Sequence, residues 1–212
     1  MGKRHRNRQN ATPIKPTFTR GDCNHSAPTL VFDKPFNIWA GAGELRCRPP
    51  EGALLVDLAD MYSIGIRASG LDLPKALKLR KVEIDWPDMN RAFIGKNSWL
   101  EIAKWFKRDF HKTGIFIACQ AGHGRTGTAL VLLGSLLEAI PKDIDPIVFV
   151  RNKYCIEAVE SATQIAYIEE VLGIKTNQKP SMGGFFTGFG PVSRPCYKRI
   201  QGVECYHTCY GT

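Results

Sequence analysis

The chain has 212 residues, of which 43% are hydrophobic and 10% aromatic, and its formal net charge is +9. This length and composition are typical of a globular protein with one domain-sized core, and they exclude a fibrous or wholly disordered chain. Residues 1–22 hold six Lys/Arg and one Asp, and residues 175–212 hold five Lys/Arg and one Glu, so the middle of the chain is neutral. That distribution excludes a uniformly basic domain and favours two solvated, basic ends.

Targeting signals are not evident in the sequence. No apolar run approaches the length of a membrane span, and the opening residues MGKRHRNRQN lack the apolar core of a signal peptide. Arg6 stands where a myristoylation signal has Ser or Thr. Seven cysteines without a secretory context argue against a disulfide framework. We therefore expect a cytoplasmic, intracellular protein with no membrane span.

Composition divides the chain into three parts. Residues 1–25 are polar, basic and dotted with proline, which predicts a flexible arm. Residues 26–174 are predicted to form the folded domain. Residues 175–212 form a basic C-terminal extension that contains the glycine-rich stretch SMGGFFTGFGP and several cysteines.

Strands and helices are predicted to alternate within the domain. The segments 53–58 (ALLVDL) and 81–84 (KVEI) are predicted to form strands, and 114–119 (GIFIAC) is predicted to form a short apolar strand of the fully buried kind. Ser98-x-x-Glu101 predicts a capping box at the start of a helix through residue 111, and Ser161-x-x-Gln164 predicts another at the start of a helix that ends near 173. Residues 126–139 and 144–154 are expected to form two further helices. This order predicts an α/β fold with a central, mostly parallel sheet flanked by helices.

The segment IACQAGHGRTGTALVLL, residues 117–133, joins a strand to a helix through a glycine-rich turn. A helix N-terminus presents unpaired N–H groups and the positive end of the helix dipole to such a turn. Gly122, Gly124 and Gly127 allow the backbone to curl around a small anion, and the Arg125 fork can grip two of its oxygens. Cys119 at the base of this cradle is favoured as a thiolate, because the same donors stabilise S⁻.

These residues resemble a known family. CQAGHGRTG, residues 119–127, looks like the Cys-x5-Arg-Ser/Thr signature of cysteine-dependent protein tyrosine and dual-specificity phosphatases. Trp86-Pro87-Asp88 is similar to the mobile acid loop of that family, and AVESATQIAYIEEVL, residues 158–172, resembles its last helix. The resemblance extends from about residue 32 to 173 and implies that residues 26–174 are a phosphatase domain with a dual-specificity phosphatase-like fold.

The resemblance also implies a mechanism. Cys119 would attack the phosphorus, Arg125 would stabilise the equatorial oxygens, and Asp88 would protonate the leaving oxygen. The Thr126 hydroxyl would hydrogen-bond the sulfur and ease its departure. The residues expected to bind the substrate are Gln120, Ala121, Gly122, His123, Gly124, Arg125 and Thr126. No metal and no other cofactor is needed, and the implied substrate is a protein phosphorylated on tyrosine, with phosphoserine and phosphothreonine as an extension.

Several assignments have alternatives. Asp85 competes with Asp88 as the acid, although Asp88 holds the acid's place in the motif. The simplest interpretation of His123 is exposure at the pocket rim, and Gln164 is expected to cap its helix, with the orientation of water as a minor alternative. Ala118 stands where the family usually has a histidine that supports the thiolate, so we expect reduced but not absent activity.

Other functional classes compete with the phosphatase interpretation. Gly122-x-Gly124-x-x-Gly127 also matches a dinucleotide-binding fingerprint, with Asp143 and Asp145 near the distance of its acidic residue but in front of an apolar run. RNA 5′-triphosphatases belong to the same superfamily, and the basic ends allow RNA or another polyanion as a partner. A weakly active phosphate-binding adaptor is a third class.

The C-terminal extension holds a last cluster: Cys196, Cys205, His207 and Cys209. Their spacing resembles no known zinc-binding pattern, and the sequence Cys-x-x-Cys is absent. Both observations favour peripheral thiols that bind no metal. A zinc clip that joins them to Cys23 and His25 is the alternative hypothesis.

Overall fold

The computed structural model describes residues 23, 25–43, 47–59 and 81–181, together with the backbone of two strands at 195–200 and 203–208. Residues 182–191 of the glycine-rich stretch and most of the N-terminal arm lie outside the described residues. Within the described part, no helix is long and apolar enough to cross a bilayer.

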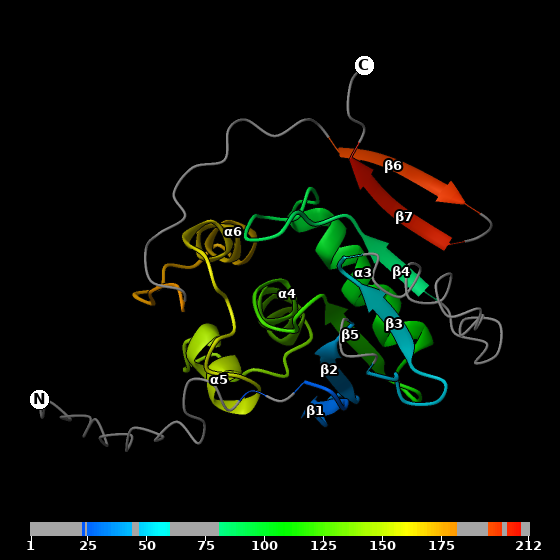
Figure 1. Ribbon diagram of the computed structural model, residues 1–212, viewed down its shortest axis with the longest axis horizontal. Coiled ribbons are helices and arrows are strands. Elements are labelled where there is room, and N and C mark those ends of the chain that lie inside the picture. The colour runs from blue at the N-terminus through cyan, green and yellow to red at the C-terminus, as the bar shows by residue number, and fades with distance from the viewer. Residues whose placement is uncertain are drawn as a thin grey trace, which may run out of the picture.

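Seven strands of the described residues form one sheet, in the order β1-β2-β5-β3-β4-β7-β6 (Figure 1). The strands are β1 (Thr29–Phe32), β2 (Ile38–Ala42), β3 (Leu54–Asp57), β4 (Lys81–Ile84), β5 (Ile115–Cys119), β6 (Pro195–Ile200) and β7 (Val203–Thr208). The four inner pairings, from β2 through β5, β3 and β4 to β7, are parallel. The two outermost pairings are antiparallel, so the sheet is mostly parallel, as predicted.

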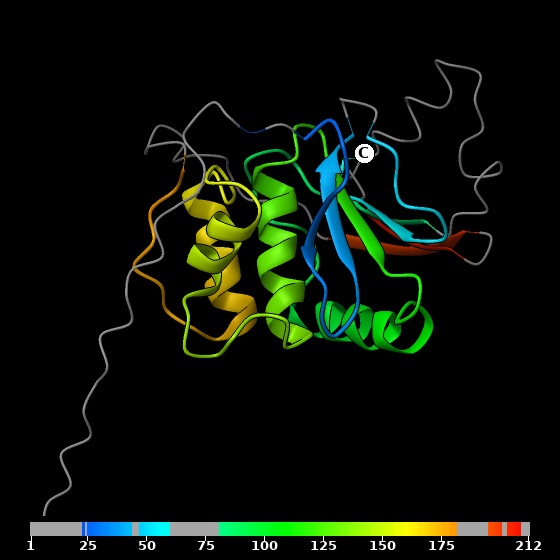
Figure 2. The ribbon, with the colours of Figure 1, turned by 90° about the horizontal axis from the view of Figure 1, so that it is seen from below.

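Four helices are described: α3 (Lys96–Asp109), α4 (Gly124–Leu136), α5 (Pro146–Lys153) and α6 (Ala162–Leu172). Helix α4 contacts all three of the others, and Figure 2 shows α4, α5 and α6 side by side on one side of the sheet. The α/β fold with a helix-flanked central sheet is therefore confirmed.

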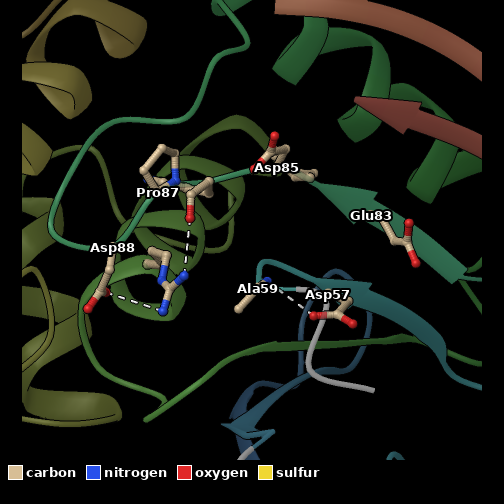
Figure 3. A pocket seen from close by; sticks show the side chains of 9 residues that line it. Asp57, Ala59, Glu83, Asp85, Pro87 and Asp88 are labelled. Carbon is tan, nitrogen blue, oxygen red and sulfur yellow. Dashed lines mark hydrogen bonds and ion pairs between the residues drawn. The ribbon is translucent and has the colours of Figure 1, made fainter. Parts of the chain in front are cut away.

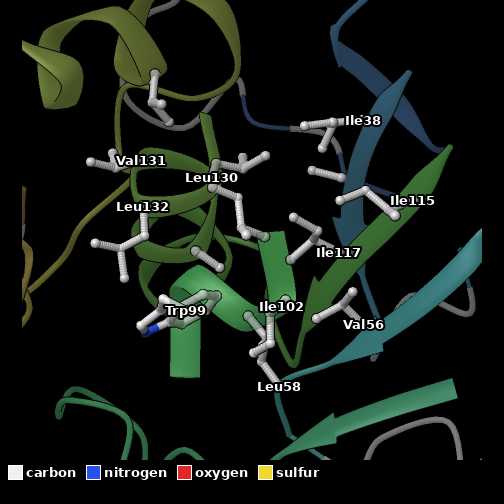
Figure 4. Packing of buried hydrophobic residues seen from close by; sticks show 14 of the residues in the cluster. Ile38, Val56, Leu58, Trp99, Ile102, Ile115, Ile117, Leu130, Val131 and Leu132 are labelled. Carbon is white, nitrogen blue, oxygen red and sulfur yellow. The ribbon is translucent and has the colours of Figure 1, made fainter. Parts of the chain in front are cut away.

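The core lies between the sheet and these helices. Every second residue of the inner strands, such as Ile38, Val56 and Ile117, faces Leu130 of α4 and Ile102 of α3 (Figure 4). Leu55, Phe116 and Ala118 face the other side of the sheet, where they form a smaller cluster with Ala53 and Cys47. Because β5 is covered on both sides, all five of its side chains are buried, which explains its uninterrupted apolar sequence.

The helix starts differ in part from the prediction. Helix α3 begins at Lys96 with Gly95 as its N-cap and no side-chain cap, so the predicted Ser98-x-x-Glu101 capping box is wrong. Ser98 and Glu101 both lie within the helix. The N–H of Glu101, which Ser98 would cap, is far enough from the helix start to bond to a backbone carbonyl one turn earlier. Helix α4 begins at Gly124, two residues before the predicted start. The capping box of α6 is confirmed, with Ser161 and Gln164 bonded reciprocally, and Gly173 ends the helix with a left-handed φ of 68°.

Candidate active site

Strand β5 carries Cys119 to the carboxyl edge of the sheet. Both of its neighbours, β2 and β3, run parallel to it, so the three strands end at the same edge. Backbone N–H groups of Gly43 and Leu58 donate to the carbonyls of Cys119 and Ala118, each at 2.8 Å. These bonds hold the strand end in place, and the Cys119 residue is only 3% exposed.

The turn between β5 and α4 depends on glycine. Gly122 has a φ of 84°, and a β-carbon there would lie 3.1 Å from the carbonyl oxygen of Gly41. Tyr154, which follows α5, donates its hydroxyl to the Gly122 carbonyl at 2.6 Å. The turn is therefore fixed from two sides, and another residue at 122 would be strained.

Arg125 lies in the first turn of α4 with its side chain 8% exposed. Its Nη1 donates to the carbonyl of Trp86 at 3.1 Å, and its Nη2 lies 3.2 Å from Oδ1 of Asp88 (Figure 3). Its Nε is buried and has no partner within the described residues. The structure therefore brings Arg125 and the Trp86-Pro87-Asp88 segment together.

The segment with Asp88 is anchored at both ends. Trp86 is 2% exposed, packs edge-on against Trp99 and Tyr167, and donates its indole N–H to the Asn90 carbonyl at 2.7 Å. Ser161 donates its hydroxyl to the Met89 carbonyl at 2.6 Å. Between these anchors the Asp88 side chain is 67% exposed. The carboxylate is thus presented to solvent by a fixed backbone.

A cavity of about 410 Å³ adjoins this segment. Its lining residues are Asp57, Ala59, Glu83, Ile84, Asp85, Trp86, Pro87, Asp88 and Arg125. Figure 3 shows Asp88 on one side of this cavity and Asp57 on the other. Cys119 is not among the lining residues, so the cavity is bounded by the acidic segment and the guanidinium instead of the thiol.

The other expected binding residues surround the turn. Gln120 and Ala121 are exposed, whereas Gly122, Gly124 and Thr126 are buried. The Thr126 hydroxyl has no hydrogen-bond partner in the described part of the chain, so the expected bond to the Cys119 sulfur is not formed. Asp85 also lines the cavity, but it is Asp88 that pairs with Arg125.

His123 does not simply lie at the rim of the pocket. Its side chain is 19% exposed and its ring packs edge-on against His25, with the ring centroids 4.8 Å apart. The loop turns at Gly122, so that the next side chain faces the N-terminal segment instead of solvent. Burial lowers the pKa of His123, and burial followed by the charge of His123 lowers the pKa of His25 to about 4.

Sequence reasoning missed Glu160 and Tyr154, which both contact the turn. Glu160 interacts with the backbone of Gly124. Burial, and to a smaller extent the charge of Asp88, raises the pKa of the Glu160 carboxyl. Glu160 immediately precedes the Ser161 cap, a position that carries no motif of its own. Gln164 accepts N–H bonds from Glu160 and Ser161, while its buried Nε2 has no partner among the described residues.

The dinucleotide interpretation finds no support. Asp145 caps α5 by accepting from the N–H groups of Ile147 and Val148, so it does not end a strand. Residues 137–181, all of which are described, contain no strand that could present an acidic residue to a ribose.

Comparison with known proteins gives fold neighbours only. No protein-family model and no curated protein matches the sequence significantly. Among solved structures, Tk-PTP in a mutant form is 21% identical, with 63% of this chain and 88% of that chain covered and a TM-score of 0.46. Tk-PTP in its active form is 18% identical, with 63% and 90% covered and a TM-score of 0.46. Kinase associated phosphatase (KAP) with serine for its catalytic-site cysteine is 16% identical, with 64% and 85% covered and a TM-score of 0.45.

Proposed function

We propose that this chain is a cysteine-dependent phosphatase that removes phosphate from phosphotyrosine in proteins, and from phosphoserine and phosphothreonine, through a cysteinyl-phosphate intermediate. The observation that carries the proposal is the contact of Arg125 with both the Trp86 carbonyl and the Asp88 carboxylate. This contact joins the helix that follows Cys119 to the segment that carries a candidate proton donor, although the two are far apart in sequence.

In the first step the Cys119 thiolate forms a bond to phosphorus while the bond from phosphorus to the leaving oxygen breaks. The bond electrons pass to that oxygen, and Asp88 donates the proton that neutralises it. The first-turn N–H groups of α4 and the Arg125 guanidinium stabilise the charge on the equatorial oxygens.

In the second step water attacks the phosphorus of the cysteinyl phosphate and gives up a proton to the Asp88 carboxylate. The sulfur leaves as a thiolate, and inorganic phosphate is released. Because Arg125 is paired with Asp88 in this structure, the proposal requires the guanidinium to exchange that partner for phosphate oxygens.

The experiment that tests the proposal is Cys119→Ser assayed with an aryl phosphate. The expected result is a loss of turnover of about 10³-fold or more, because a serine hydroxyl is far less acidic than a thiol. Cys47→Ser is the matched control: Cys47 is also buried, and burial raises the pKa of its thiol to about 11. We expect that variant to retain its activity.

Substrate comparison sharpens the test. Turnover of a phosphotyrosine peptide with none of a 5′-triphosphate RNA supports the proposal, whereas the reverse would assign the site to RNA. Undetectable turnover of either substrate by the wild-type chain, with phosphate still bound, would identify a phosphate-binding adaptor instead. Full turnover by Cys119→Ser would show that Cys119 is not the nucleophile.

A further inference from the structure

Four side chains of the types that bind metals lie close together beside the turn between β5 and α4. Cys23 and His25 come from the N-terminal segment, His123 from the turn itself, and Cys155 from the chain just after α5. Their ligand atoms all lie within 4.8 Å of one another, and the side chains of His25 and Cys155 are fully or almost fully buried. Three segments that are distant in sequence thus supply one compact set of two thiols and two imidazoles.

The imidazoles of this cluster lack partners. Both ring nitrogens of His25, which is 3% exposed, have no hydrogen-bond partner in the described residues, and neither does Nε2 of His123. A buried polar atom without a partner is costly, by about 1–3 kcal/mol, so such atoms are rare in folded proteins. Three of them within one cluster indicate that the cluster holds a ligand.

The surroundings of the cluster suit a metal ion. Nδ1 of His123 faces carboxylate oxygens of Glu157 and Glu160, each at 3.9 Å, which leaves Nε2 to face the cluster. A carboxylate behind a histidine ligand fixes the ring orientation in many metal sites. The backbone N–H of Glu157 also donates to the Cys155 sulfur at 3.4 Å, a bond that stabilises a thiolate.

We propose that Cys23, His25, His123 and Cys155 bind one Zn²⁺ ion in a tetrahedral Cys2His2 site. Two sulfur and two imidazole ligands in a tetrahedral arrangement are typical of structural zinc. On binding, each thiol releases its proton to solvent, so two thiolates balance the charge of the ion.

The geometry is close to that of a filled site. Zinc bonds of ~2.3 Å to sulfur and ~2.0 Å to nitrogen place tetrahedral ligand atoms about 3.3–3.8 Å apart. The Cys23 and Cys155 sulfurs are 2.6 Å apart, so they separate by about 1 Å around the ion. The zinc hypothesis drawn from the sequence joined Cys23 and His25 to Cys196, Cys205, His207 and Cys209, whose side chains lie outside the described part of the chain. Among the described residues, His123 and Cys155 lie beside Cys23 and His25.

Because the protein fills all four positions, this zinc is structural and leaves no position for a substrate. It joins the N-terminal segment to the turn that precedes α4. Any effect on turnover rests on the proposed function, whereas zinc binding itself is measured without a substrate. A negative result for zinc would therefore leave the proposed function standing, and a negative result for turnover would leave the zinc site standing.

The test measures the zinc content of the full chain purified without chelators. We expect about one zinc ion per wild-type chain and a loss of about tenfold or more in Cys23→Ser and in Cys155→Ser, since thiolates supply most of the affinity. The matched control is Cys47→Ser, which removes a buried cysteine outside the cluster and retains its zinc. Zinc that persists in both ligand variants would place the ion elsewhere and overturn the proposal.

A second measurement on the wild-type chain avoids variants that fail to fold. Cys23 and Cys155 are expected to resist alkylation until a chelator is added, while the reactivity of Cys47 does not change. Replacement of zinc by Co²⁺ is expected to give the strong visible absorption of a tetrahedral sulfur-nitrogen site. A Cys23–Cys155 disulfide in the unreduced protein, or wild-type protein with neither zinc nor the cobalt spectrum, would overturn the proposal.

Discussion

Asp88 and Asp85 differ in what they contact, although both line the same cavity. Asp88 pairs with Arg125, the residue proposed to hold the phosphate, and its carboxylate remains 67% exposed. Asp85 follows strand β4 directly and precedes the buried Trp86. A proton donor must reach both the leaving oxygen and solvent; Asp88 is exposed to solvent and lies beside the proposed phosphate-binding residue.

Asp88→Asn is therefore expected to slow hydrolysis most for substrates with basic leaving groups. For a phosphotyrosine peptide the loss should be of the order of 10²–10⁴-fold, and for an activated aryl phosphate it should be much smaller. The measurement is turnover across aryl phosphates that differ only in leaving-group basicity. Asp85→Asn is the control and should lower all rates evenly. A leaving-group dependence that appears in Asp85→Asn instead would move the acid to Asp85.

Helix α6 supports the proposed acid loop as well as the core. Its N-cap, Ser161, accepts the N–H of Gln164 at 3.1 Å and donates its own hydroxyl proton to the Met89 carbonyl at 2.6 Å. Tyr167, later in the same helix, packs against Trp86 and donates its hydroxyl proton to the Ile94 carbonyl. One helix therefore holds the loop on both sides of Asp88.

Ser161→Ala is expected to lower the free energy of unfolding by about 1 kcal/mol, the usual cost of a lost N-cap. It should also speed amide exchange at Asn90, because the Met89 carbonyl loses its donor. Urea unfolding and hydrogen exchange measure the two effects. Ser98→Ala is the control, since Ser98 lies within α3 and caps nothing. Equal losses in the two variants would show that the Ser161 cap has no special role.

At the scale of the whole molecule, the larger core of the described residues lies between the sheet and helices α3 to α6, and it encloses an ionisable side chain. Tyr167 is buried with its hydroxyl between the Trp99 indole and the Ile94 carbonyl. Burial raises the pKa of Tyr167 above its ordinary value of 10.0. The folded state therefore holds this proton more tightly than the unfolded state does. The stability that this proton contributes is fully present below about pH 10 and is lost as the pH rises beyond it.

Tyr167→Phe separates this titration from the loss of the hydroxyl bonds. Below pH ~9 the variant should be less stable than the wild type by about 1–3 kcal/mol, because the Trp99 N–H loses its acceptor. Above pH ~10 the difference in the free energy of unfolding should narrow. Deprotonation of Tyr167 in the unfolded state destabilises the wild-type fold there, and the variant has no phenol to titrate. Urea unfolding at several pH values measures the difference. A constant difference across the whole range would show that Tyr167 does not titrate in this window.

The strongest patterns predicted the structure well. The limits of strand β4 match the prediction, and those of β5 match it within one residue. The β5 sequence is apolar throughout because the strand is buried on both faces, whereas the residues of β4 alternate between buried and partly exposed. Strand β2, IWAGA, was missed because its small residues lack any periodicity. The Ser161 box is confirmed but the Ser98 box is wrong, since the same letters fit a helix interior as well as a helix start.

The site was predictable only where its residues are close in sequence. Cys119, the glycines and Arg125 form one continuous segment, so a pattern could find them. The contact of Arg125 with Asp88 depends on how α4 and the segment after β4 meet in space. The Cys/His cluster spans 132 residues between Cys23 and Cys155, and no spacing rule predicts such a convergence.

The position of β5 in the sheet has a consequence for how the chain folds. β5 lies between β2 and β3, so residues 115–119 meet only partners from much earlier in the chain. Such long-range parallel pairings close large loops, and proteins dominated by them fold slowly. The turn after Cys119 is contacted from the side of β2, through Gly41, so we expect it to acquire its shape only after that strand has docked. We therefore expect recovery of the proposed phosphatase activity during refolding to follow the docking of β2 and β3 onto β5.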